Sequence, residues 1–178
     1  MNDIRLETIA PAKKILIKIG SAVLTGTDGL DLKIVGSLVQ EMCDLTRRGH
    51  SIVLVTSGAI ASGRHRLGAA GKPKSIPEKQ AFAAVGQGRL MRVYSKAFEK
   101  NNLYVAQILL TLADLTDRRR YLNIRNTLSQ LMEWHVTPII NENDTVAVDE
   151  IKFGDNDNLA AMIANVVGVD LFINLTTT

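Results

Sequence analysis

The feature that most constrains this chain is an alternation between short apolar runs and longer segments with helical spacing. The apolar runs cover residues 14–19, 51–56, 103–111, 136–141 and 169–175. The helical segments cover residues 31–48, 57–68, 78–100, 118–134 and 158–168. Repeated strand–helix–strand units join by right-handed crossovers into a parallel sheet covered on both faces. The sequence therefore predicts an α/β fold, a three-layer α/β/α sandwich with a mainly parallel central sheet.

Local signals support these assignments. The run SIVLVT at residues 51–56 is almost continuously apolar, which is typical of a parallel strand buried on both faces. Asp31 is a suitable N-cap for the first long helix, and Gly49 lies where that helix should stop. Cys43 falls inside the same helix, where a small helix residue is a better interpretation than a reactive thiol.

Composition narrows the class of protein. The chain has 178 residues, 46% of them hydrophobic and 22% charged, which fits one folded domain and excludes a disordered or collagen-like chain. No apolar stretch approaches the ~20 residues that cross a bilayer, so we expect no membrane partner. The single cysteine excludes an intrachain disulfide and favours a reducing, cytoplasmic setting.

Charge is unevenly spread, although the net charge is only +3. Residues 64–100 hold nine Lys or Arg and two Glu, and a further basic run follows at residues 118–120. A solvated helix face explains these charges better than attraction of nucleic acid. Aromatic residues make up only 4% of the chain, which leaves few rings for stacking on bases. We therefore expect no nucleic-acid partner.

Unusual polar and glycine residues collect where the predicted strands end. The segments after the first, second, fourth and last strands read KIGSAVLTG, TSGAIASG, NENDTVAVDEIKFGDNDN and LTTT. In parallel α/β sheets, ligands bind at the carboxyl ends of the strands. This shared location is the main indication, from the residues alone, of where the site lies.

Two of these segments are suited to anions. Lys18 lies inside an apolar strand, which is costly unless the ammonium meets an anion, and Gly20 and Ser21 follow it. The alternative is that Lys18 belongs to an edge strand and points to water. At the second strand end, Ser57 precedes a helix, where it either helps to bind a carboxylate or phosphate or is simply an N-cap.

The acidic segment at residues 141–157 is the most distinctive, with six Asp or Glu and one Lys. Each Asn or Asp alone is explained by turns and caps, but two clusters of them exceed that need. They could hold an ammonium group, order a lysine or coordinate Mg²⁺. The segment is predicted to be a loop or hairpin, and its candidate short-strand positions are Val146, Val148, Ile151 and Phe153.

Two other kinds of site are not expected. The three histidines (His50, His65 and His135) are scattered, which argues against a histidine metal site, and no metal ligands are predicted in the chain itself. The sequence GxxxxGK[ST] does not occur, so a P-loop nucleotide site is not expected.

Together and in this order, the motifs resemble the amino acid kinase family, and within it the enzymes that phosphorylate the side-chain carboxylate of glutamate. The matching strings are KIGSAVLTG, VTSGAIASGR, KQAFAAVGQGRL, QILLTLADLTDRRRYLNIRNTL and, most specifically, PIINENDTVAVDEIKFGDNDNLAA. The resemblance covers residues 13–175. It implies ATP-dependent formation of glutamyl 5-phosphate, the first step of proline biosynthesis, with Mg²⁺ arriving with ATP.

The resemblance also implies roles for single residues. Lys18 corresponds to a catalytic lysine that stabilises the transferring phosphoryl group, helped by the backbone around Gly20 and Ser21. Asp157 corresponds to an aspartate that orients catalytic lysines rather than acting as a base. The positions that correspond to glutamate-binding residues are Ser57, Gly58, Asp144 and Asn156. Ala59 lies in the same loop as Ser57 and Gly58. Lys152 lies in the same substrate loop as Asp144 and Asn156 and is a further candidate substrate-binding residue.

The last segment departs from the family pattern. The family has a Leu-Thr-Asp sequence that begins the nucleotide site, whereas here Thr176 is followed by Thr177 in place of the aspartate. The rest of the family's nucleotide-binding half does not follow. The expectation is an N-terminal extension at residues 1–12 and, at 13–178, an amino-acid-binding part truncated before most of the ATP site. Such a chain is expected to bind glutamate and to turn over poorly.

Three alternatives remain open at this stage. The chain could be a non-catalytic glutamate- or proline-binding module, another carboxylate kinase of the same fold, or, least favoured, a nucleic-acid binder. From the resemblance we also expect feedback inhibition by proline, with residues 68–77 and the acidic segment contributing, and a homo-oligomer formed through the helix at 78–100. The last strand is expected at an exposed sheet edge.

Overall fold

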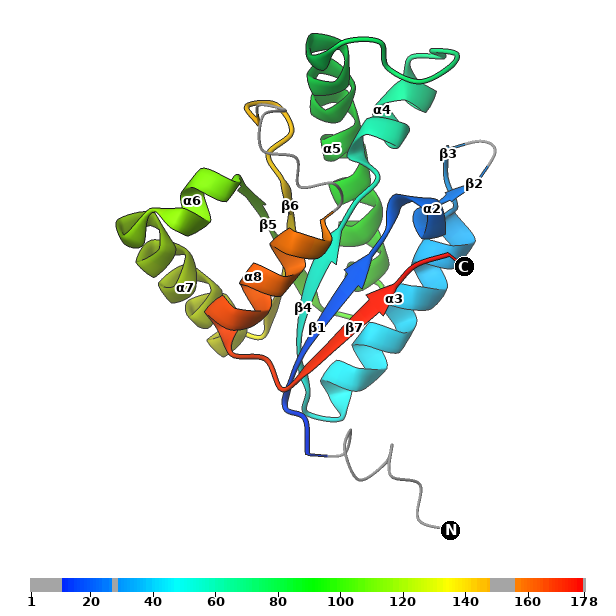
Figure 1. The fold of residues 1–178 in the computed structure, drawn as a ribbon. Coiled ribbons are helices and arrows are strands. Elements are labelled where there is room, and N and C mark those ends of the chain that lie inside the picture. Colours follow the sequence, from blue (N-terminus) through cyan, green and yellow to red (C-terminus); the bar gives the residue numbers. More distant parts are fainter. Residues whose placement is uncertain (1–10, 27–28, 148–155, 178) are drawn as a thin grey trace.

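The computed structural model describes residues 11–26, 29–147 and 156–177. Its central sheet contains five strands, in the order β5-β6-β4-β1-β7, and every neighbouring pair is parallel (Figure 1). The strands are β1 (Lys14–Ile19), β4 (Ser51–Thr56), β5 (Tyr104–Leu110), β6 (Val136–Glu142) and β7 (Leu171–Leu175). The predicted α/β fold with a mainly parallel sheet is confirmed.

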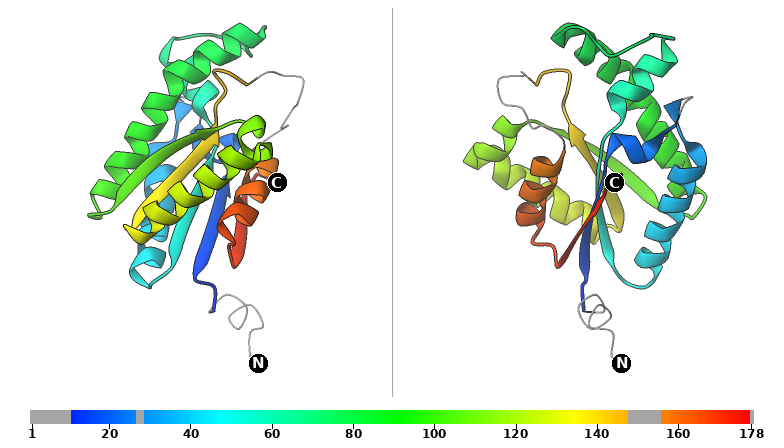
Figure 2. Two further views of the ribbon diagram at one scale, coloured as in Figure 1. Left: turned by 90° about the vertical axis from the view of Figure 1, so that its left-hand side faces the viewer. Right: turned by 45° about the vertical axis from the view of Figure 1, so that its right-hand side comes forward.

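Helices cover both faces of the sheet. The helices described are α2 (Ser21–Leu24), α3 (Leu32–Arg47), α4 (Ala59–Arg66), α5 (Ile76–Glu99), α6 (Leu112–Thr116), α7 (Arg118–Glu133) and α8 (Asp157–Val167). One face carries α3 and α5, and the opposite face carries α6, α7 and α8 (Figures 1 and 2). The result is three layers, as the alternation of strands and helices predicts.

The two faces of each strand supply two separate cores. In β1, Ile15, Ile17 and Ile19 pack with residues of α3 and α5, whereas Leu16 packs with α7 and α8. Alternate side chains of a strand point to opposite faces of the sheet, so this division follows from the strand geometry. Lys18 therefore points toward the same face as Leu16, the face covered by α8.

Several boundaries differ from the predictions. Helix α5 begins at Ile76 rather than at residue 78, because the Ser75 hydroxyl accepts from the Glu78 N–H and Pro77 fits the first turn. The short helices α2 and α6 and the small hairpin of β2 (Thr25–Gly26) and β3 (Gly29–Leu30) were not predicted. Helix α6 starts where the Thr111 N–H donates to the Asp114 carboxylate at 2.7 Å, a local interaction too short to produce a periodic pattern.

Two further expectations concern sheet edges and membranes. Strand β7 lies at one edge of the five-stranded sheet, as expected for the last strand. Val146 lies in a turn rather than in a strand, and the candidate strand positions Val148, Ile151 and Phe153 lie outside the described residues. Among the helices that the structure describes, none is both long and apolar enough to span a bilayer.

Candidate functional site

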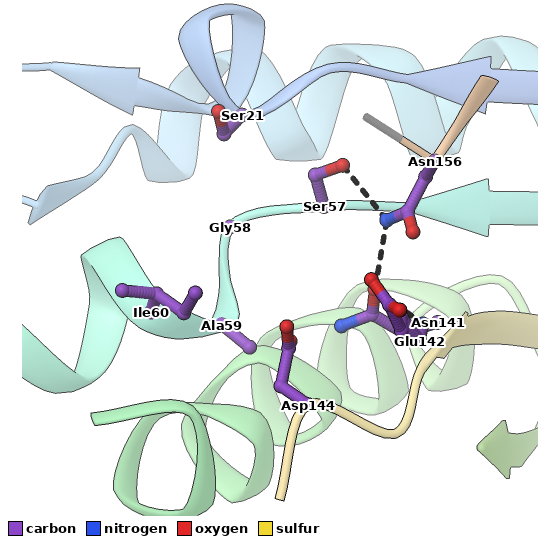
Figure 3. A pocket seen from close by; sticks show the side chains of 9 residues that line it. All are labelled: Ser21, Ser57, Gly58, Ala59, Ile60, Asn141, Glu142, Asp144 and Asn156. Carbon is purple, nitrogen blue, oxygen red and sulfur yellow. Dashed lines mark hydrogen bonds between the residues drawn. The ribbon is translucent and has the colours of Figure 1, made fainter. Parts of the chain in front are cut away.

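A small polar pocket lies where β1, β4 and β6 end. These strands are neighbours in the sheet and run in the same direction, so their carboxyl ends meet at one edge. The pocket has a volume of about 160 Å³. It is lined by Ser21, Ser57, Gly58, Ala59, Ile60, Asn141, Glu142, Asp144 and Asn156 (Figure 3). This is the edge at which the sequence predicted ligand binding.

Asn156, the residue before α8, joins three parts of the pocket. Its Nδ2 atom lies 2.7 Å from the Thr56 carbonyl oxygen. The same atom lies 2.9 Å from Ser57 Oγ and 2.9 Å from Asn141 Oδ1 (Figure 3). Asn156 is 7% exposed. Buried amides are stable only when they are hydrogen-bonded, so these contacts fix the residue against the ends of β4 and β6.

Asn141, in the last part of β6, is bonded on both sides of its amide. Its Oδ1 atom accepts from Asn156 and from the Glu142 N–H at 2.9 Å, and its Nδ2 atom donates to Gln87 Oε1 at 2.9 Å. Gln87 belongs to α5, more than fifty residues away in the sequence. A hydrogen-bonded network therefore connects α5 to the end of β4.

Lys18 lies beside this pocket and is paired with a carboxylate. Its ammonium nitrogen is 2.7 Å from Asp157 Oδ1, and the lysine is only 1% exposed. Asp157 is the first residue of α8, and its Oδ1 atom also accepts from Asn174 Nδ2 at 3.1 Å. Strand β1 lies between β4 and β7, so the alternative of an edge-strand lysine pointing to water is wrong.

Two consecutive residues, Asn156 and Asp157, connect the pocket to Lys18. Asn156 reaches the ends of β4 and β6, and Asp157 reaches Lys18 on β1. Ser57 lies at the same edge of the sheet, because its N–H donates to the Ile19 carbonyl at 3.1 Å. Lys18, Ser57 and Asp157 thus lie at one edge, as convergence of the strand ends requires.

Gly20 and Ser21 have different places in this arrangement. The Gly20 N–H donates to the Leu175 carbonyl at 3.1 Å, so in this conformation it does not point toward a ligand. A Cβ atom at Gly20 would lie 3.8 Å from Lys18 Nζ, so the missing side chain leaves space beside the ammonium. Ser21 instead lines the pocket.

Gly58 sets the entry to α4. It is the N-cap of that helix, with φ of 103°, a backbone conformation that favours glycine. The possibility that Ser57 is the N-cap is therefore wrong. The Ser57 hydroxyl instead accepts from Asn156 and faces the pocket. With Gly58 turning the chain, the first residues of α4 also line the pocket.

Asp144 is an acid of the pocket with a shifted pKa. Burial raises its pKa from 3.8 to about 6, and the nearby positive charge of Lys79 opposes that shift only in part. Near neutral pH the carboxylate is mostly ionised in a poorly hydrated position. Such a group favours a cationic ligand, for example an ammonium.

The remaining site predictions have separate outcomes. Ser57, Gly58, Asp144 and Asn156 all line the pocket. Thr176 and Thr177 follow β7, are exposed and do not line it. Lys152 lies outside the described residues. The structure gives these residues positions only, and their roles in binding or catalysis stay predictions.

Some residues of the site were not singled out from the sequence. Asn141 and Glu142 were noted only as members of the acidic segment, although both line the pocket. Gln87 and Asn174 were not identified, because each contacts the site from a distant part of the chain. Gly86 and Gly88 are unusual inside a helix, because glycine is a poor helix former. No sequence pattern, however, assigns Gln87, which lies between them, to the site. Within the described residues, no group of three His, Cys, Asp or Glu could hold a metal ion.

Comparison with known proteins gives consistent similarities. The profile of the amino acid kinase family matches residues 13–178. The glutamate 5-kinase of Syntrophus aciditrophicus (strain SB) is 67% identical over 178 residues, all of this chain and 46% of that protein. The glutamate 5-kinase of Maridesulfovibrio salexigens is 53% identical over 173 residues, 97% of this chain and 46% of that protein. The chain spans about half the length of these curated relatives.

Proposed function

Because the chain belongs to the amino acid kinase family, we propose that its pocket binds glutamate for ATP-dependent phosphorylation of the side-chain carboxylate. The product is glutamyl 5-phosphate, which begins proline biosynthesis. One observation carries the proposal: Asn156 lines the polar pocket and is bonded to the end of β4, and the next residue, Asp157, forms an ion pair with the buried ammonium of Lys18. The names of the similar proteins support the choice of glutamate.

The pocket offers complementary groups for an amino acid. Asp144 is a carboxylate that burial leaves poorly solvated, so the substrate ammonium would relieve its unfavourable environment. The Ser57 hydroxyl and the start of α4 are suited to a substrate carboxylate, since helix N-termini attract negative charge. In this proposal the amino acid is bound by its charges from opposite sides.

The chemistry requires alignment and charge neutralisation more than proton transfer. A glutamate side chain has an unperturbed pKa of about 4.3, so it is already a nucleophilic carboxylate at neutral pH. No general base is required. Lys18 would offset the repulsion between this carboxylate and the phosphoryl group, and Asp157 would keep the lysine in position.

The residues on the β1 side fit a phosphoryl group. The Lys18 ammonium is buried, and the absence of a Cβ at Gly20 leaves space next to it. ATP would supply the phosphoryl group and bring Mg²⁺ for further charge neutralisation. Thr176 and Thr177 follow β7 next to β1, and we propose that they contact the nucleotide.

Calorimetric titration with glutamate tests the proposal. We expect saturable binding of glutamate and weaker binding of aspartate and glutamine, which change the length or the charge of the side chain. Asp144→Asn should weaken glutamate binding at least about tenfold, because it removes a charge-assisted contact. Asp44→Asn, which alters an exposed carboxylate on α3, is the matched control and should bind like the wild type.

The same titration separates the alternatives. Glutamate binding without any binding of an ATP analogue would support a non-catalytic binding module. A preference for another carboxylate substrate would support a different kinase of this fold. Wild-type protein that binds none of these amino acids would contradict the proposal.

The proposal extends to regulation and assembly. Proline inhibition is proposed from the family resemblance, and proline should then compete with glutamate in the titration. A homo-oligomer through α5 is proposed because Ile76 and Val85 of that helix are each 41% exposed. Sedimentation of the wild type and of Val85→Asp would test the oligomer. A cytoplasmic setting, where ATP and glutamate are both available, completes the proposal.

A further inference from the structure

Three amide side chains form a network at the pocket, and two of them belong to its lining. Asn156 contacts the Thr56 carbonyl, Asn141 contacts Asn156, and Gln87 contacts Asn141. We call Gln87, Asn141 and Asn156 the amide network. Asn141 is 2% exposed, so water cannot readily replace these partners.

Two backbone groups fix the direction of every amide in this network. The Thr56 carbonyl can only accept, so the Asn156 atom beside it must be the nitrogen. The Glu142 N–H can only donate, so the Asn141 atom beside it must be the oxygen. The other atom of Asn141 is then a nitrogen, and Gln87 must present its oxygen to it.

Within the described residues, this orientation leaves the amide nitrogen of Gln87 unsatisfied. Its Nε2 atom is buried and has no hydrogen-bond partner among the described residues. Turning the Gln87 amide around would place one NH₂ group against another, because Asn141 already presents its nitrogen. The accepted hydrogen bond from Asn141 is therefore the contact that accounts for the conformation of Gln87.

We infer that Gln87 is a positioning residue, which fixes the Asn141 amide and through it Asn156, and so holds the amino-acid pocket in its binding geometry. This inference rests on the proposed binding of glutamate. Gln87 does not line the pocket, so it acts through Asn141 and Asn156, which do. The Glu142 N–H decides which Asn141 atom is the oxygen, and Gln87 satisfies the NH₂ group on the other side. Without an acceptor at residue 87, that buried NH₂ would be left unsatisfied, which would destabilise the Asn141 conformation that accepts from Asn156.

The chemistry of the network selects the test variants. Gln87→Met keeps a long unbranched side chain but removes the acceptor. Gln87→Glu keeps an acceptor oxygen and replaces an NH₂ group that donates to no described residue, although it also introduces an ionisable carboxyl. Tyr94→Phe is the structural control, because Tyr94 lies two turns further along α5 and its hydroxyl bonds Thr56 Oγ1, outside the amide network.

Calorimetric titration of the protein with glutamate in about 0.15 M salt, which screens long-range charge effects, gives the first readout. We expect Gln87→Met to weaken glutamate binding about tenfold or more, as for an orphaned buried donor. Gln87→Glu should recover most of that loss. Tyr94→Phe should lower the melting temperature by a similar amount to Gln87→Met and leave the glutamate affinity within about twofold of the wild type.

The outcomes separate this inference from the proposed function. A wild type that does not bind glutamate refutes the proposed function and the inference with it. A wild type that binds, with Gln87→Met equal to it or with Tyr94→Phe equally impaired, refutes the inference alone. Side-chain amide NMR of the wild type provides a test that needs no variant. The Asn141 NH₂ protons should exchange far more slowly than those of exposed asparagines, and equal exchange rates would overturn the inference.

Discussion

The crossing of α4 and α5 leads to our most detailed prediction, because two glycines let the helices touch. A Cβ atom added at Gly86 would lie 1.8 Å from the Ala59 carbonyl oxygen and 2.4 Å from the Gly63 nitrogen. Both are backbone atoms, so no rotation of a side chain can relieve the overlap. To restore an ordinary contact of about 3.4 Å, α4 would have to move by about 1.6 Å.

The expected size of the effect follows from two opposing contributions. Overpacking a close contact costs about 3 kcal/mol at the upper end of its usual range. Alanine is a better helix former than glycine by about 1 kcal/mol. We therefore expect Gly86→Ala to lower the free energy of unfolding by about 2 kcal/mol or more. In a chain of this length, that corresponds to a fall of about 4–8 °C in melting temperature.

Gly88 supplies a matched control in the same helix. A Cβ atom there meets nothing within 4 Å, so Gly88→Ala keeps the gain in helix propensity without the overlap. We expect it to raise the free energy of unfolding by about 1 kcal/mol. Urea denaturation of both variants measures the difference. Equal stability of the two variants, or a Gly86→Ala protein as stable as the wild type, would refute the explanation from helix contact.

Three further predictions concern the site. Lys18→Met should lower any ATP-dependent phosphorylation of glutamate by about 10²–10³-fold, because Lys18 offsets charge on the phosphoryl group. Glutamate binding measured by calorimetry should stay nearly unchanged. An unchanged rate of phosphorylation would contradict this role. Glutamate affinity should fall about tenfold between pH 7 and pH 5, because the pKa of Asp144 is about 6 and the ammonium needs the ionised carboxylate. Folding raises this pKa, so the stability of the free protein should decrease as the pH rises from about 4 through 6. Asp144→Asn should remove the pH dependence of glutamate affinity and the pH dependence of stability. If either pH dependence persists in that variant, Asp144 is not its cause. Gly58→Ala should cost about 1–2 kcal/mol of unfolding free energy by urea denaturation, since φ of 103° strains a residue with a Cβ. The added Cβ would make only ordinary contacts, 3.7 Å from Leu30 and 3.9 Å from Leu24, so the cost comes from the backbone, and no loss would contradict the strain.

The sequence predicted the frame of this fold well for a physical reason. Strands buried on both faces, such as β4, are nearly continuous apolar runs, and helices such as α3 repeat their apolar residues with a regular spacing. Helix α6 has five residues and depends on Thr111 and Asp114, so it has no period to detect. The predicted start of α5 was late, because Pro77 was assigned to the preceding loop although proline fits a first helical turn.

The site was predictable in its location and less so in its contacts. Ser57, Asp144 and Asn156 follow strand ends or precede a helix, and parallel topology brings such segments to one edge. The bond from Asn141 to Gln87 depends on how α5 packs on the sheet, which no local pattern encodes. The same holds for the bond between Asn174 and Asp157, because it requires the pairing of β1 with β7.

Backbone amide NMR during a glutamate titration tests the central claim most directly. The account predicts saturable shifts that concentrate at residues 57–60, at 141–144 and at the start of α8, with little change on α7 or at the amino ends of the strands. Shifts centred away from the pocket, or none at all at saturating glutamate, would show that these strand ends do not form an amino-acid site.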